Sequence, residues 1–126
     1  MKKLGLISTL ALALGAFPAL AQDKNIKIGV LDDMSGIYGD VGGAGSVIAA
    51  QMAIEDSGLA AKGWKIDVVS ADHQNKPDIG VNVARQWADK DRVDGIFGVL
   101  NSGVALAVNG VAKEKNLVYM NSGAAA

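Results

Sequence analysis

Small hydroxylated and amide residues recur at three places in the sequence, each directly after an apolar segment. The three groups are Asp33, Ser35, Gly36 and Tyr38, then Asn101 and Ser102, and finally Asn121, Ser122, Gly123, Ala124 and Ala125. Hydroxyl groups, and backbone N–H groups at a helix start, can bind an anion such as a carboxylate. A tyrosine can form a wall with an apolar ring and a polar tip. These residue types suggest non-covalent binding of a small anionic ligand.

Each group also has a purely structural interpretation, which the residues alone leave open. Ser102 stands at a predicted helix start, where serine is common simply as an N-cap. Ser35–Gly36 is also consistent with ordinary turn chemistry, and Tyr38 with packing inside a loop. The binding hypothesis therefore depends on all three groups lying on the same edge of one sheet.

Residues suited to covalent or metal chemistry are sparse. His73 is the only histidine and the chain has no cysteine. The sequence therefore excludes any triad or metal site that needs a second histidine, and it excludes a zinc site built from thiolates. We interpret Asp72–His73 as a polar pair at a strand end, and Asp32–Asp33 as solvated loop or helix-capping residues. The glycine-rich stretch 39–45 does not fit a dinucleotide fingerprint, because Ile48 stands where the last glycine is required. We therefore predict no enzymatic activity, no cofactor and no metal.

The elements that would position the three groups alternate between strand and helix. Apolar runs predict strands at 26–31, 64–70, 95–100 and 117–120, and helical spacing predicts helices at 46–57, 77–90 and 104–116. Ser46 is the predicted cap of the first helix, and Pro77 the predicted first residue of the second. This pattern is typical of an α/β fold, Rossmann-like or flavodoxin-like, with a parallel sheet and helices on both faces. The carboxyl ends of parallel strands share one edge, where such folds bind ligands.

Residues 1–21 form a predicted secretory signal peptide. Lys2 and Lys3 precede the apolar stretch Leu4–Leu20, and Ala19–Ala21 is an A-x-A cleavage site. The alternative, a membrane anchor, is disfavoured because the stretch is short for a span and no stop-transfer charges follow it.

Cleavage would leave residues 22–126, whose 10 basic residues (12 less the two signal-peptide lysines) and 13 acidic residues give a net charge of −3. That charge argues against nucleic acid as a partner. Because there is no cysteine, we expect neither disulfides nor a lipid-anchoring lipobox. The expected location is the soluble periplasm.

Several segments of the mature sequence together form a recognisable pattern: 26–31, 33–38, 42–45, 50–56, 70–78, 101–102, 114–116 and 122–125. In these segments the sequence resembles the periplasmic substrate-binding proteins of branched-chain amino acid (Leu/Ile/Val) ABC transporters. The resemblance implies the N-terminal lobe of a two-lobe, type I periplasmic-binding-protein fold that closes on its ligand. It also implies a solute-binding component that delivers a small carboxylate-bearing ligand, such as a branched-chain amino acid, to an inner-membrane permease. A ligand-sensing receptor or regulatory domain on the same fold is the alternative.

The resemblance also assigns roles to individual residues. Ser102 and the loop that contains Ala124, Ala125 and Ala126 would clamp the ligand carboxylate, and Tyr38 would form the side-chain wall. Ser35 and Ser122 complete the candidate site, from their places at the predicted sheet edge. The family's threonine falls at position 126, where this chain has Ala126, so one hydroxyl donor is missing.

The second lobe that the resemblance implies is absent from the 126 residues. We therefore expect residues 22–126 to be a partial N-terminal lobe whose fourth strand lacks a covering helix. Apolar surface would then be left bare, and the isolated segment would bind amino acids very weakly. The sequence does not identify the ligand.

Overall fold

The computed structural model describes residues 23–125, so the predicted signal peptide and Ala126 lie outside the described part. The elements follow in the order β1 (Asn25–Asp32), α1 (Gly43–Asp56), β2 (Lys65–Asp72), α2 (Pro77–Gln86), β3 (Gly95–Gly98), α3 (Ser102–Lys115) and β4 (Val118–Asn121). A short 3₁₀ turn (Ala60–Lys62) precedes β2, and a π-helical turn (Trp87–Asp91) extends α2. The predicted alternation of strands and helices is confirmed.

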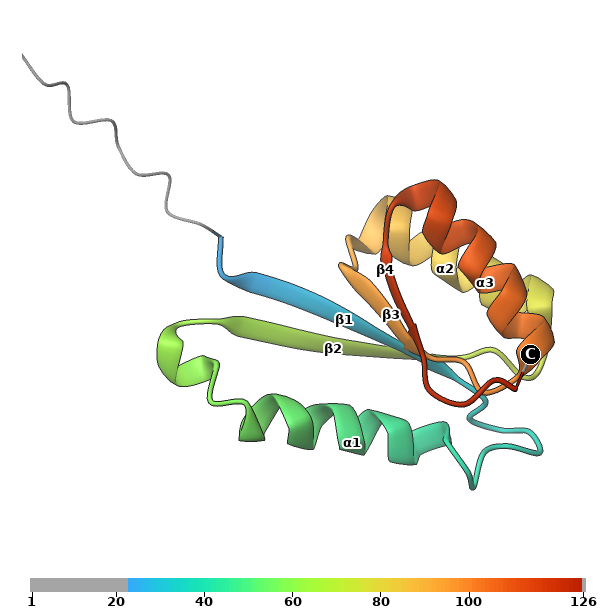
Figure 1. The fold of residues 1–126 in the computed structure, drawn as a ribbon, viewed down its shortest axis with the longest axis horizontal. Coiled ribbons are helices and arrows are strands. Elements are labelled where there is room, and N and C mark those ends of the chain that lie inside the picture. The colour runs from blue at the N-terminus through green and yellow to red at the C-terminus, as the bar shows by residue number, and fades with distance from the viewer. Residues whose placement is uncertain (1–22, 126) are drawn as a thin grey trace, which may run out of the picture.

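The four strands form one parallel sheet in the order β2-β1-β3-β4. β1 is flanked by β2 and β3, and its pairing with β2 runs in register from Asn25 opposite Lys65 to Asp32 opposite Asp72. Helix α1 covers one face of the sheet, whereas α2 and α3 lie on the other (Figure 1). The predicted parallel α/β sheet with helices on both faces is therefore confirmed, and all four carboxyl ends lie along one edge.

The main core lies between the sheet and the pair α2 and α3. Its fully buried side chains include Leu31, Ile96 and Val108. Trp87 is only 5% exposed and packs against the backbone of β1. A Cβ atom added at Gly29 would lie 2.4 Å from Trp87 Cζ3, so this close approach requires glycine.

The opposite face of the sheet is covered less completely. A cavity of about 500 Å³, lined mostly by apolar side chains of α1, β1 and β3, lies between α1 and the sheet. On β4, Val118 and Met120 are 57% and 58% exposed, in agreement with the expected bare apolar surface. None of the helices formed by residues 23–125 has the length and apolar character that a membrane crossing requires.

Some predicted boundaries were wrong. Ser46 does not cap α1, which begins at Gly43 with Gly42 as its N-cap residue, and the Ser46 hydroxyl instead donates to Asp32 Oδ2 at 2.8 Å. β2 continues beyond residue 70 because its last residue pairs with the end of β1. β3 ends at residue 98 because Val99 adopts a left-handed φ of 63° that strand geometry excludes. Pro77 begins α2 as predicted.

Candidate functional site

Leu100 joins the three predicted groups at the carboxyl edge of the sheet. A Cβ atom added at Gly42 would lie 2.4 Å from Leu100 Cδ1, and one added at Gly123 would lie 2.4 Å from Leu100 Cδ2. Leu100, two residues beyond the end of β3, therefore packs against both the loop after β1 and the loop after β4. Leu100 was not predicted as a site residue, because an apolar residue at the end of an apolar run carries no distinguishing signal.

Ser102 faces the loop after β4. Its hydroxyl oxygen accepts a hydrogen bond from the backbone N–H of Ala125 at 3.2 Å. The N-cap of α3 is Asn101, whose Oδ1 accepts from the Val104 N–H at 3.0 Å. The alternative that Ser102 serves only as an N-cap is therefore wrong, and its hydroxyl links two of the predicted groups.

Asn121, the last residue of β4, holds the loop that follows. Its Nδ2 donates to the Val99 carbonyl at 2.6 Å, and its Oδ1 accepts from the N–H groups of Ala124 at 2.7 Å and Gly123 at 3.1 Å. Ser122 and Ala125 are exposed at this edge and Ala124 is half-buried. A carboxylate bound here would share or replace the hydrogen bonds that these N–H groups now donate to Asn121 and Ser102.

Tyr38 and Ser35 make different contacts within the loop after β1. Tyr38 is 36% exposed, and its backbone N–H donates to Asp33 Oδ2 at 2.9 Å. The Ser35 hydroxyl donates to Asp72 Oδ2 at 2.6 Å, at the end of the edge strand β2. Because β2 and β4 lie at opposite sides of the sheet, the structure does not bring Ser35 to the contact between Ser102 and Ala125.

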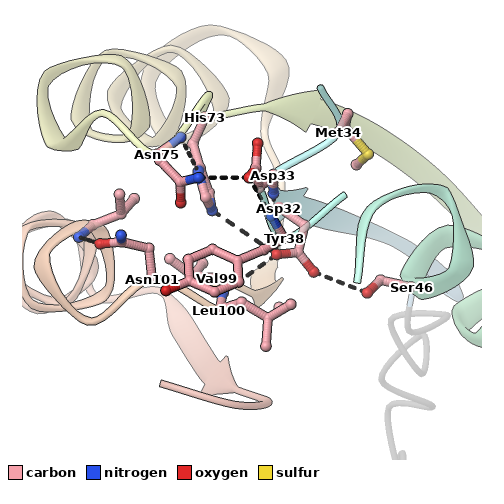
Figure 2. A network of polar contacts seen from close by, with 12 residues as sticks. Asp32, Asp33, Met34, Tyr38, Ser46, His73, Asn75, Val99, Leu100 and Asn101 are labelled. Carbon is pink, nitrogen blue, oxygen red and sulfur yellow. Dashed lines mark hydrogen bonds and ion pairs between the residues drawn. The ribbon is translucent and has the colours of Figure 1, made fainter. Parts of the chain in front are cut away.

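Beneath these loops lies a polar cluster whose burial was not predicted from the sequence (Figure 2). Asp32, Asp33 and His73 are each 0% exposed, so the prediction of a solvated loop at Asp32–Asp33 is wrong. Asp32 Oδ1 accepts from the N–H groups of Asp33 at 3.1 Å and Leu100 at 3.3 Å, while its Oδ2 accepts from Ser46. Asp32 thus joins β1 to the segment after β3 and to α1, which are distant in the sequence.

Asp33 holds the loop after β1 from within. Its Oδ1 accepts from the Gly36 N–H at 2.8 Å, and its Oδ2 accepts from the Tyr38 N–H and from Asn75 Nδ2 at 2.5 Å. Buried carboxylates require such partners, and both oxygens of Asp33 have them. The carboxylate therefore fixes the backbone that carries Tyr38.

His73 is a neutral, buried member of this cluster. Its Nδ1 accepts from the Asn75 N–H at 3.1 Å, so the ring proton resides on Nε2. Nε2 has no hydrogen-bond partner within residues 23–125 and lies 3.9 Å from Asp32 Oδ1. Burial lowers the pKa of His73, and the negative charges of Asp32, Asp33 and Asp72 offset this only in part.

Asp72, at the end of β2, is ionised. Burial would raise the pKa of Asp72, but hydrogen bonds from the Ser35 hydroxyl and from the N–H groups of Met34 and Gln74 outweigh that effect and lower it. Asp72 and His73 are thus a polar strand-end pair, in which each side chain organises backbone. Residues 23–125 hold no group of three or more acidic, histidine or cysteine side chains arranged to hold a metal ion.

Comparison with known proteins places this arrangement among binding proteins. A family model described as "Periplasmic binding protein" matches residues 25–126. The Leu/Ile/Val-binding protein homolog 7 of Brucella melitensis is 36% identical over 129 residues, which cover 99% of this chain and 31% of that protein. The chain thus spans about a third of the length of the curated relatives that it matches.

Solved structures agree in fold. A branched-chain amino acid ABC transporter periplasmic ligand-binding protein from Burkholderia xenovorans is 50% identical, with a TM-score of 0.76, over 80% of this chain and 27% of that one. The branched-chain amino acid transporter substrate-binding protein of Streptococcus pneumoniae, solved with isoleucine, is 26% identical, with a TM-score of 0.70, over 80% of this chain and 29% of that one. The family resemblance and the expected fold are thereby confirmed.

Proposed function

The chain belongs to the periplasmic binding protein family, and on that premise we propose that it is part of the solute-binding component of an ABC importer. Residues 22–126 would form part of the N-terminal ligand-binding lobe of a longer, two-lobe protein. The proposed ligand is a small molecule with a carboxylate group, such as a branched-chain amino acid. The names of the Brucella relatives and the isoleucine bound to the pneumococcal neighbour support this class of ligand. The family consists of binding proteins, so we propose no catalysis.

The hydrogen bond between Ser102 Oγ and the Ala125 N–H, at 3.2 Å, carries the proposal. It brings the start of the 14-residue helix α3 to the loop after β4. A helix N-terminus bears partial positive charge, and a hydroxyl beside it can donate to an anion. We infer that Ser102, Ser122, Ala124 and Ala125 receive the ligand carboxylate, together with Ala126, which lies outside the described residues. Tyr38 would form the side-chain wall, and Ser35 would border the same cleft.

The proposed location is the periplasm, reached through a signal peptide at residues 1–21, and the proposed macromolecular partner is an inner-membrane ABC permease. Nucleic acid is not a proposed partner. Sequencing the N-terminus of the protein from a periplasmic fraction would test this proposal. We expect a mature chain that begins at Gln22 and carries no lipid. A chain that retains residues 1–21 would contradict it.

The ligand site is tested by titration calorimetry of the complete gene product with L-isoleucine and L-leucine. The Ser102→Ala variant should bind about tenfold more weakly, because it loses one hydroxyl donor to a charged group. Ser70→Ala is the matched control, since Ser70 is exposed on β2 and away from the carboxyl edge contacts. Equal affinity of Ser102→Ala and Ser70→Ala, or no binding of any amino acid to the wild type, would overturn the proposed site.

Two further observations test the two-lobe proposal. Genomic DNA beyond codon 126 should encode a second α/β lobe, beside permease and ATPase genes; a fused signalling domain there would favour the ligand-sensing alternative. The segment 22–126 alone should bind leucine very weakly, because half a cleft cannot enclose a ligand. Micromolar binding to that isolated segment would contradict this expectation.

A further inference from the structure

We propose that Asn75 is a positioning residue for the ligand wall, acting through Asp33 on the backbone of Tyr38. This inference rests on the proposed function, because Tyr38 is a wall only if the carboxyl edge binds a ligand. The family resemblance assigned no role to Asn75 or to Asp33. Their role follows from three contacts that connect the turn after β2 with the loop after β1 (Figure 2).

The first contact fixes the loop to Asp33. The two carboxylate oxygens accept the N–H groups of Gly36 and Tyr38, three and five residues further along the chain. The carboxylate also fills the inside of the loop, since a Cβ atom added at Gly36 would lie 2.5 Å from Asp33 Oδ2. The Asp33 carboxylate therefore holds the N–H side of the Tyr38 backbone, whereas the Tyr38 carbonyl accepts from the N–H groups of Val41 and Gly42.

The second contact fixes the Asp33 carboxylate to Asn75. Nδ2 of Asn75 donates at 2.5 Å to Oδ2, the same oxygen that accepts the Tyr38 N–H. Both oxygens of a carboxylate are hydrogen-bond acceptors, so the Asn75 amide must turn its NH₂ group toward Asp33. Oδ1 of Asn75 is buried without a hydrogen-bond partner within residues 23–125. The contact with Asp33 alone therefore sets the orientation of the Asn75 amide. In this orientation Oδ1 of Asn75 accepts no hydrogen bond from residues 23–125.

The third contact holds Asn75 itself. Its backbone N–H donates to Nδ1 of His73 at 3.1 Å, and its φ of 55° lies in the left-handed region. Asparagine tolerates that conformation better than most residues with a side chain. The side chain of Asn75 therefore projects from a turn that is anchored in the buried cluster.

The start of the same loop has an independent anchor. Asp72 accepts from the Met34 N–H at 2.9 Å and from the Ser35 hydroxyl at 2.6 Å. Removing the Asn75 amide would leave this anchor intact and would loosen the loop mainly at its Tyr38 end. Asn75 therefore acts on the part of the loop from Gly36 to Tyr38, which distinguishes a positioning role from a general contribution to stability.

The test uses Asn75→Gly in the complete gene product, because glycine accepts a φ of 55° without strain and removes only the amide. Lys76→Ala, exposed in the same turn, is the matched control. Hydrogen exchange of the peptide 33–42, measured without ligand by mass spectrometry, should accelerate about tenfold in Asn75→Gly and not in Lys76→Ala. Unchanged exchange in Asn75→Gly would overturn the positioning role whatever the protein binds.

The second readout is affinity for L-isoleucine and L-leucine in a double-mutant cycle with Tyr38→Ala. Asn75→Gly should weaken binding about tenfold in the wild type and less than about twofold in the Tyr38→Ala background. Equal losses in both backgrounds would show that Asn75 does not act through Tyr38. If neither amino acid binds the wild type, or Tyr38→Ala binds normally, the proposed wall fails, and exchange alone still decides whether Asn75 positions the loop.

Discussion

His73 should make the stability of this protein depend on pH in a window where no other side chain of the chain ordinarily titrates. The folded protein holds the ring neutral, because burial lowers the pKa of His73, whereas the unfolded chain should titrate near the ordinary value of 6.5. As the pH falls through 6.5, the unfolded chain binds a proton that the folded chain does not. The free energy of unfolding therefore decreases as the pH falls. The decrease ends once the pH drops below the folded pKa.

The size of this pH effect on the free energy of unfolding is limited because His73 binds only one proton. A single group changes the free energy of unfolding by at most about 1.4 kcal/mol per pH unit, and by about 1.2 kcal/mol between pH 7 and 5.5 if the folded ring stays neutral. His73 is the only histidine of the 126 residues, so no other imidazole contributes. Asp72 and Glu114, whose pKa values are lowered from 3.8 and 4.5, lose their contributions only at lower pH.

The assay is urea denaturation of residues 22–126 at several pH values from 5 to 7.5, followed by tryptophan fluorescence. His73→Asn is the matched variant, because its Oδ1 can replace Nδ1 as the acceptor for the Asn75 N–H but does not titrate. We expect the wild-type stability to fall toward pH 5 and the variant to be less stable at pH 7.5 yet flat across the window. An equal pH slope in both proteins, or no slope in the wild type, would refute the assignment of a neutral buried ring.

Three further predictions follow from close contacts and from the sequence. Gly29→Ala should lower the free energy of unfolding by about 1–3 kcal/mol in urea denaturation, because its Cβ would lie 2.4 Å from the Trp87 ring; unchanged stability would show that the ring can shift. Gly123→Ala should weaken isoleucine binding in calorimetry and change the melting temperature little, because the added Cβ would displace Leu100 at the carboxyl edge. Ala126→Thr should tighten isoleucine binding severalfold by restoring a hydroxyl donor, and no change would remove position 126 from the proposed site.

The fold could be predicted from the sequence because its signals are local. Apolar runs and helical spacing recur in alternation, and Pro77 marks a helix start by its own backbone geometry. The start of α1 was misplaced for a physical reason: Gly43–Gly45 is a poor helix-forming sequence, so the pattern becomes recognisable only at Ser46. The hydroxyl that was expected to cap the helix instead bonds Asp32, a contact that depends on tertiary packing.

The candidate site could be predicted only in part. The groups at Ser102 and Ala125 were found because polar residues after apolar runs mark strand ends, and the structure joins them. The structural roles of Leu100 and Asn121 were missed, since in the sequence both resemble ordinary strand-end residues. Leu100 fills a gap between two glycines, and the Asn121 amide holds the loop that follows β4. The ligand-binding roles of the site remain predictions.

The burial of Asp32 and Asp33 follows from the position of β1 in the sheet and not from their local sequence. Because β1 lies between β2 and β3, one carboxylate can reach the segment after β3 and the other the turn after β2. Adjacent acids would be solvated at the end of an edge strand, where one neighbouring segment is missing. At the end of β1 each finds backbone or amide donors, so this dipeptide organises the loops on both sides of the proposed site.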